Sequence, residues 1–105
     1  MARDSINSIS LQSTVTNRST KFAKLGNIVV AFLELSVTAE ISGTWVTIAT
    51  IPEGFRPAAS GRIVWLHGET GGTLPGSVES NGSVKINGTA VANAVICANF
   101  CYTTA

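Results

Sequence analysis

Hydrophobic and polar residues alternate over much of the chain with the two-residue period of half-buried β-strands. The clearest segment is residues 28–39, in which every odd position is apolar. Its even positions begin apolar, with Ile28, Val30 and Phe32, and then become polar. Because a chain of 105 residues can hardly cover both faces of a strand alone, we expect a second sheet on one side and another copy of the chain on the other.

The same pattern predicts the other elements. Strands are expected at residues 9–15, 44–51, 62–67 and 91–102, and a hairpin at 78–86. Polar and glycine-rich residues predict turns at 16–20, 42–43 and 87–88, and an irregular stretch at 68–76. No window shows a helical period. We therefore expect an all-β fold, a single antiparallel β-sandwich or jelly-roll-like barrel.

The register of the hairpin follows from its residues. A two-residue Asn-Gly turn would place Val78 opposite Lys85. A three-residue loop at 80–82, with Gly82 in the left-handed conformation, places Val78 opposite Val84 instead. We prefer this second arrangement, a type I turn with a G1 bulge, because it pairs apolar residues on one face.

Residues 51–57, Ile-Pro-Glu-Gly-Phe-Arg-Pro, are expected to form a rigid corner between two strands. Pro52 lacks an N–H and ends the ladder, and Gly54 can adopt a positive φ. Pro57 favours an extended conformation at Arg56. We expect Arg56 to donate hydrogen bonds to neighbouring carbonyls or to another protomer.

Composition narrows the classes of function. Charged residues make up 12% of the chain and hydrophobic residues 45%, a balance that suits contact with carbohydrate or protein. The net charge is +1 without a Lys/Arg cluster, so no nucleic-acid partner is expected. No run approaches the roughly 20 apolar residues of a membrane span. The N-terminus lacks the apolar stretch of a signal peptide, so we expect synthesis in the cytosol.

Several sequence features follow one another in a fixed order. They are Lys-Leu-Gly-Asn-Ile-Val at 24–29, Trp45 ahead of residues 48–57, the hairpin at 78–86, and Tyr-Thr at 102–103. In this order they resemble the C-terminal head domain of receptor-binding proteins in phage tails, in particular lactococcal-type siphophage adhesins and related tail-fibre tips. The resemblance covers residues 22–103, and the corner is its most specific part.

The resemblance implies a trimeric, jelly-roll-like β-sandwich at the virion tail tip that binds saccharide on the bacterial surface and contacts tail or baseplate proteins. It divides the chain into a polar N-terminal segment with a short strand, residues 1–21, and a head domain, residues 22–105. Family members usually carry a stem and an N-terminal anchor. Neither precedes Met1, so we expect an isolated tip domain or a free-standing small protein.

Saccharide sites combine an aromatic face with converging polar groups. The most suitable constellation is Arg62, Trp65, His67 and Glu69, because the last three alternate onto one side of a strand that a glycine-rich loop follows. The alternative is that Ile63 and Trp65 face the core, with the polar pair at the wet end of the strand. In the family the sugar site often lies between protomers, which the sequence of one chain does not locate.

Two further residues are saccharide-binding candidates. Trp45 is the second aromatic candidate, and its alternative role is a core or strand-edge residue near the corner. Asn81 lies at the hairpin tip, where it is well placed for contact, although the turn already explains it.

Catalysis is not expected. Glycan hydrolysis usually needs two carboxylates across a cleft, and the acidic residues here are scattered without a recurring spacing. There is no Gly-x-Ser-x-Gly, His/Cys metal cluster or phosphate loop, so neither a metal nor a cofactor is expected. Cys97 and Cys101 would lie about 13 Å apart along a strand, too far for a disulfide, and are expected to be reduced. The alternative function is a purely structural tail-tip protein that mediates protein–protein assembly.

Overall fold

The computed structural model describes residues 3–68 and 72–104, which form nine strands and no helix. The strands are β1 (Arg3–Ile6), β2 (Ser10–Leu11), β3 (Val15–Leu25), β4 (Ile28–Val37), β5 (Ile41–Thr50), β6 (Gly61–His67), β7 (Gly72–Val78), β8 (Ser83–Ala90) and β9 (Val95–Thr103). Over these residues, no helix is long and apolar enough to span a membrane.

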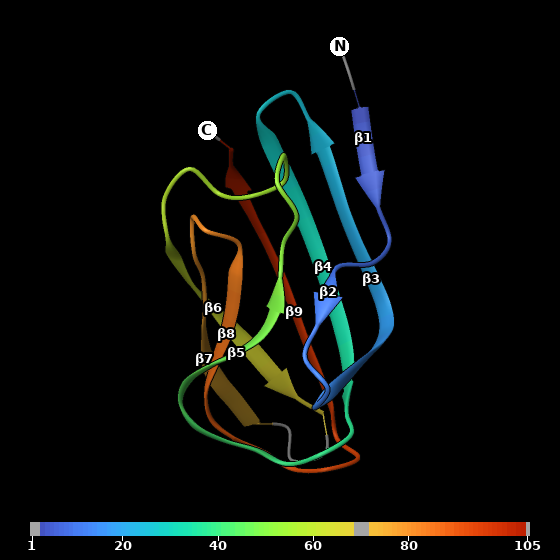
Figure 1. The fold of residues 1–105 in the computed structure, drawn as a ribbon, viewed down its shortest axis with the longest axis vertical. Coiled ribbons are helices and arrows are strands. Elements are labelled where there is room, and N and C mark those ends of the chain that lie inside the picture. The colour runs from blue at the N-terminus through green and yellow to red at the C-terminus, as the bar shows by residue number, and fades with distance from the viewer. Residues whose placement is uncertain (1–2, 69–71, 105) are drawn as a thin grey trace.

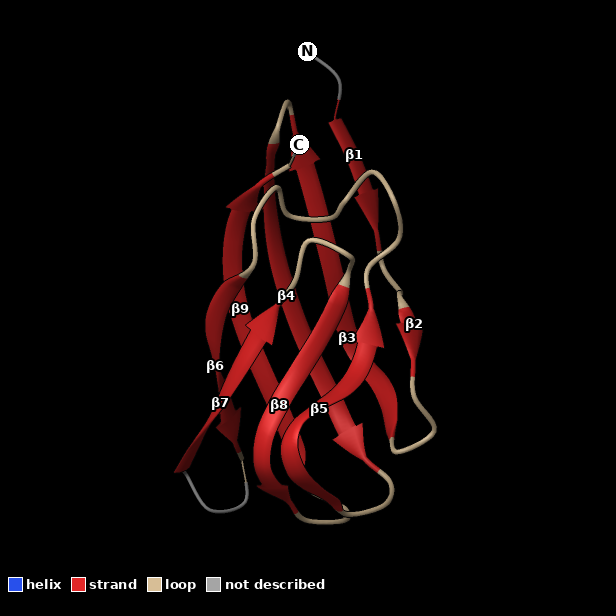
Figure 2. Cartoon of the chain, turned by 60° about the vertical axis from the view of Figure 1, so that its left-hand side comes forward, coloured by secondary structure: helices blue, strands red, loops and turns tan. Residues whose placement is uncertain are grey.

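The described strands pair antiparallel in one sheet, in the order β1-β3-β4-β9-β6-β7-β8-β5-β2. The sheet curls on itself, so that β5 and β8 lie in front of β4 (Figure 2). The backbone N–H of Gln12 donates to the carbonyl of Ile48 at 2.9 Å, and that of Thr38 donates to Thr14 at 2.8 Å. The molecule is elongated, 41 × 23 × 23 Å, and β1 begins at the end where β9 finishes (Figure 1). The predicted all-β, sandwich-like fold is confirmed.

The core lies inside the curl, where every second residue of each long strand points. On β4 the odd positions from Val29 to Val37 are buried, as their alternation predicted. Trp65, Phe22 and Ile96 join them from other strands, each with no exposed surface. Burying one such side chain stabilises the fold by about 1.5–3 kcal/mol.

The convex side of the sheet carries an apolar surface that this chain does not cover. Ile28, Val30 and Phe32 of β4 are 50%, 59% and 36% exposed, and Val64 and Leu66 of β6 are 58% and 52% exposed. Strand β9 lies between β4 and β6 in the sheet. We call these five side chains the outer apolar face. The even positions at the start of β4 are thus not buried by this chain, and the second copy expected to cover them stays a prediction.

Three predicted turns are wrong, because pairing within the sheet overrides local residue preference. Residues 16–20 belong to β3 and pair with β4 around a bulge between Asn17 and Ser19. Residues 42–43 and 87–88 lie inside β5 and β8, where Gly43 and Gly88 pair at φ 155° and 121°. These glycines allow the paired strands to bend rather than to reverse.

Element boundaries differ in three further places. The strand expected at residues 9–15 is reduced to β2, and the last strand begins at Val95 rather than at residue 91. Part of the expected irregular stretch is strand β7, from Gly72 onward, while residues 69–71 lie outside the described residues. Strand β7 pairs with β6 along its length, and this partner outweighs its glycine and proline content.

The hairpin and the corner agree with the prediction. Val78 pairs with Val84, and Gly82 has φ 94°. Residues 51–57 link β5 to β6 outside any strand, and Arg56 Nε donates to the carbonyl of Ile51 at 2.7 Å. Arg56 therefore has the structural role expected of it.

Candidate functional site

Alternation along β6 places the predicted saccharide residues on opposite faces. Trp65 and His67 point inward and are 0% and 4% exposed, whereas Arg62 is exposed on the outer face. Trp65 Nε1 donates to the backbone carbonyl of Lys85 at 3.1 Å, so the indole is satisfied within the core. Trp65 thus faces the core, as one of the two interpretations of the sequence expected, and is not grouped with Arg62.

The other predicted residues lie apart from Arg62. His67 Nε2 accepts a hydrogen bond from the backbone N–H of Val91 at 3.4 Å. Asn81 is exposed at the hairpin tip, and its Oδ1 accepts from the backbone N–H of Ser83 at 2.9 Å, which gives it the role of a turn residue. Glu69 lies outside the described residues.

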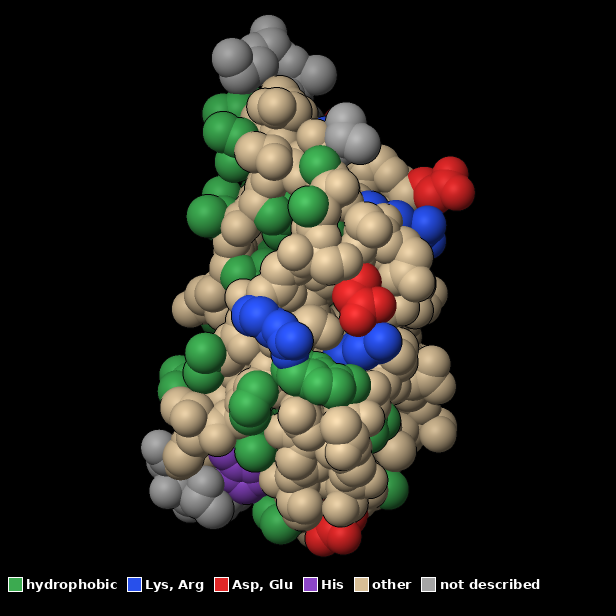
Figure 3. Space-filling model, turned by 90° about the vertical axis from the view of Figure 1, so that its left-hand side faces the viewer, with side chains coloured by type: hydrophobic (Ala, Val, Ile, Leu, Met, Phe, Trp, Pro, Cys, Tyr) green, Lys and Arg blue, Asp and Glu red, His purple; other side chains and the backbone are tan. Residues whose placement is uncertain are grey.

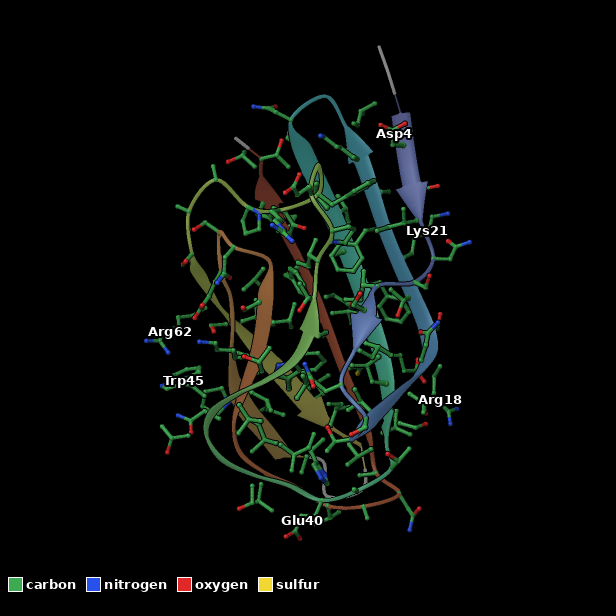
Figure 4. The ribbon with its side chains drawn as sticks, in the orientation of Figure 1. Asp4, Arg18, Lys21, Glu40, Trp45 and Arg62 are labelled. Atoms are coloured by element: carbon green, nitrogen blue, oxygen red, sulfur yellow. The ribbon has the colours of Figure 1, made fainter. Side chains whose placement is uncertain are left out.

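Trp45 and Arg62, in contrast, come together on the outer surface. A bulge in β5 between Gly43 and Val46 holds Trp45 at φ 51°. The guanidinium carbon of Arg62 lies 4.1 Å from the centroid of the Trp45 ring, a close cation–π contact. Figure 4 shows the two side chains next to each other, projecting away from the body of the molecule. Strands β7 and β8 lie between β5 and β6 in the sheet, so the contact between Trp45 and Arg62 reaches across the outer surface of β7 and β8.

Arg62 also begins a row of paired residues that runs across β6, β7 and β8. Arg62 pairs with Ser77, and Ser77 pairs with Lys85, so the three side chains share the outer face. Opposite residues on antiparallel strands have Cβ atoms about 4.5–5.5 Å apart. Lys85 Nζ forms an ion pair with Glu79 at 3.1 Å. Arg62 has no carboxylate partner among the described residues, and its guanidinium lies against the neutral ring of Trp45.

These side chains enclose a groove of about 310 Å³ that we call the Trp45 groove. Its lining residues are Trp45, Ser60, Gly61, Arg62, Ser77, Glu79 and Lys85. Figure 3 faces this side of the molecule, where Lys/Arg and Asp/Glu side chains gather around hydrophobic ones midway along the long axis. An indole next to hydroxyl, guanidinium, ammonium and carboxylate groups can hold apolar C–H groups and hydrogen-bond polar ones at the same time.

Ser77 lines this groove with a side-chain hydroxyl that has no hydrogen-bond partner in the described part of the chain. It is 7% exposed, and its hydroxyl has no hydrogen-bond partner within residues 3–68 and 72–104. Buried hydroxyls in native proteins are nearly always paired, so Ser77 is the side chain of the groove to examine for a bound partner.

Sequence reasoning found Trp45 and Arg62 but missed Ser77, Glu79 and Lys85. The hairpin register contained part of the signal, because pairing Val78 with Val84 also pairs Ser77 with Lys85. The rest depended on β7, which was predicted to be irregular, and on the bulge that turns Trp45 over the sheet. Across the described residues, no group of three or more His, Cys, Asp or Glu side chains could hold a metal ion.

Comparison with known proteins adds information on the fold. No protein-family model matches the chain, and no curated protein matches its sequence. The fold is similar to that of a phage protein. The crystal structure of the receptor binding protein (gp15) of Listeria phage PSA matches this chain with a TM-score of 0.69 and 15% sequence identity. The match covers 99% of this chain and 66% of the phage protein's chain, so the present chain spans a little under two thirds of its structural neighbour.

Proposed function

We propose that this chain is the receptor-binding head domain of a phage tail fibre, located at the virion tail tip. In this role it binds saccharide on the bacterial surface through the Trp45 groove, non-covalently and without catalysis. The chain does so as a homotrimer joined to tail or baseplate proteins.

The observation that carries the proposal is the pairing of Trp45 with Arg62 over a polar groove on the outer surface. An indole there covers the apolar C–H face of a sugar ring, and the charged groups around it bond hydroxyls. The shared fold with a phage receptor binding protein supports the same role. Low charge and a surface rich in Ser, Thr, Gly and Asn suit a protein that contacts carbohydrate.

The homotrimer rests on the outer apolar face. Monomeric proteins rarely leave a contiguous patch of large apolar side chains uncovered. Phe32 and Leu66 lie on different strands of that face, so a neighbouring copy can cover them together. Size-exclusion chromatography with light scattering should give the mass of three chains, and Val30→Asp should reduce it. A wild-type chain that runs as a stable monomer would contradict this part of the proposal.

Binding of fluorescently labelled protein to a panel of bacterial cells tests the saccharide role. Trp45→Ala and Arg62→Ala should each weaken binding to the recognised strain about tenfold or more, since stacking and charged hydrogen bonds contribute about 1–3 kcal/mol each. Arg18→Ala is the matched control, because Arg18 is also exposed but pairs with Glu34 on β4. Periodate oxidation of the cells should abolish binding. Binding that survives periodate, or that both groove variants leave intact, would reject the role.

The second candidate function is a structural tail-tip protein that only mediates assembly. The outer apolar face favours it, because such a surface fits any protein partner as well as a second copy. Groove variants would then leave host attachment of the assembled phage unchanged, while Val30→Asp would stop assembly. If the saccharide role holds, Trp45→Ala should instead reduce the attachment of assembled phage particles to the host.

A further inference from the structure

We infer that Ser77 forms a hidden hydrogen-bonding subsite of the Trp45 groove, which selects an acceptor oxygen on an exocyclic substituent of the bound sugar. This inference rests on the proposed saccharide role and specifies which part of the ligand the groove reads. The relevant oxygen is the carbonyl of an acetamido group or an oxygen of a carboxylate.

The hydroxyl of Ser77 combines burial with the lack of a hydrogen-bond partner in the described part of the chain. Ser77 Oγ is buried and unpaired among the described residues, although a side chain on the outer face of a sheet would normally meet water. Trp45, Arg62 and Lys85 line the same groove and surround it. A buried hydroxyl without a partner costs folding free energy, and an oxygen that entered the groove would remove that cost only in the bound state.

The second step is the polarity of the neighbours. Ser77 lies between Arg62 on one strand and Lys85 on the next, in directly opposed positions. Guanidinium and ammonium groups only donate hydrogen bonds, and a hydroxyl can donate as well. Hydrogen-bond donors on three neighbouring strands favour an acceptor oxygen over a ring hydroxyl, which would also present a donor to them.

The third step concerns charge. Glu79 lies 3.1 Å from Lys85 and balances it, whereas Arg62 has no carboxylate partner in the described part of the chain. The charged side chains that line the groove, Arg62, Lys85 and Glu79, therefore sum to one positive charge. Such a site accepts a neutral carbonyl as well as a single carboxylate, and these two sources of the same acceptor chemistry can be separated experimentally.

The test uses an array of immobilised sugars in matched pairs, N-acetylglucosamine with glucosamine and glucuronic acid with glucose. Wild-type protein should bind one substituted member about tenfold more tightly than its parent. A preference within the first pair identifies the acetamido carbonyl as the acceptor, and a preference within the second pair identifies the carboxylate. Ser77→Ala should bring the preferred member down to the level of its parent, and the thermal midpoint should stay unchanged or rise because an unpaired buried hydroxyl is lost.

Ser19→Ala is the matched control, because Ser19 is exposed on β3 outside the groove, and it should bind as the wild type does. Unchanged selectivity in Ser77→Ala would overturn the inference, and so would a fall in its thermal midpoint, which would reveal a structural partner for the hydroxyl. If Trp45→Ala abolishes sugar binding while Ser77→Ala does not alter it, the inference fails and the saccharide role stands. If wild-type protein binds neither these sugars nor periodate-sensitive cell surfaces, both fail together.

Discussion

The corner at residues 51–57 and the Trp45 groove use polar groups in opposite ways. In the corner the polar groups are occupied by the fold itself. Tyr102 Oη donates to the carbonyl of Phe55, Lys24 Nζ donates to that of Gly54 at 2.6 Å, and Arg56 Nε donates to that of Ile51 at 2.7 Å. Two of these side chains come from β3 and β9 and the third from the corner itself, so the corner is tied to two strands and braced internally.

In the groove, Lys85 and Glu79 pair with each other, but two other polar side chains lack such a partner in the described part of the chain and the backbone is strained. Among the described residues, Ser77 Oγ is unpaired, and Arg62 contacts the Trp45 ring but no carboxylate. Trp45 has φ 51°, in the left-handed region that costs a non-glycine residue about 1–2 kcal/mol. A region that has satisfied its own polar groups acts as a frame, whereas a region that has not is available to a ligand. The comparison favours a structural role for the corner and agrees with the binding role proposed for the groove.

The largest expected effect concerns the close contact between the hairpin and the corner. Gly82→Ala adds a Cβ that would lie 2.5 Å from the carbonyl oxygen of Ile51 and 2.6 Å from Arg56 Nε, at φ 94°. We expect a loss of about 2–5 kcal/mol in unfolding free energy, from backbone strain together with overpacking. Gly54→Ala is the matched control, because φ there is 92° but nothing lies within 4 Å. Denaturant unfolding should rank Gly82→Ala well below Gly54→Ala. Equal losses in the two variants would mean that the hairpin does not lock the corner.

The same comparison explains how far the sequence could predict each region. The corner is local, because Pro52, Gly54 and Pro57 restrict the backbone wherever they occur. The hairpin register also follows from neighbouring residues, since Val78 and Val84 are six positions apart and must share an apolar face. Such features depend on short-range geometry, and the structure bears them out.

The groove depends on long-range pairing, and the sequence could therefore predict it only in part. Arg62 and Trp45 were recognisable as candidates from residue type, but nothing local places them 4.1 Å apart across two intervening strands. No element was predicted for Ser77, which lies between the irregular stretch expected at 68–76 and the hairpin expected at 78–86. Ser77 shares the groove with Trp45, which lies at a bulge in β5 that no local residue pattern predicted. The turns expected at 42–43 and 87–88 were wrong for the same reason, since the pairing of β5 with β8 decides their conformation.

The next prediction concerns the hydrogen bond that ties β9 to the corner. Burial raises the pKa of Tyr102 well above its usual value near 10. Tyr102→Phe keeps the ring, which stacks on Phe100 at 6.0 Å, and should cost about 1–2 kcal/mol because the carbonyl of Phe55 loses its donor. Sugar binding should stay unchanged, because Tyr102 does not line the Trp45 groove.

Alkaline pH should remove the contribution of Tyr102 gradually. Because the native pKa is raised, the unfolded chain loses the phenolic proton first, so this contribution is complete below about pH 10 and falls as pH rises above it. The unfolding free energy of the wild type should approach that of Tyr102→Phe between pH 9 and 11, by up to about 1.4 kcal/mol per pH unit above pH 10. A constant difference between the two proteins over this range would show that the phenol is not buried as a hydrogen-bond donor.

The smallest expected effect tests the strain in the groove. Trp45→Ala and Trp45→Gly both remove the indole and its contact with Arg62, but glycine adopts φ 51° without the steric cost that alanine meets. We expect Trp45→Gly to be more stable than Trp45→Ala by about 1 kcal/mol, the opposite of the usual order of these residues within a strand. Both should bind cells equally poorly. Paired denaturant titrations would measure the difference, and an alanine variant at least as stable as the glycine variant would show that β5 relaxes once the ring is gone. The strain would then come from the contact between the ring and Arg62 rather than from the bulge, and the groove would be shaped by its own side chains instead of by the sheet beneath it.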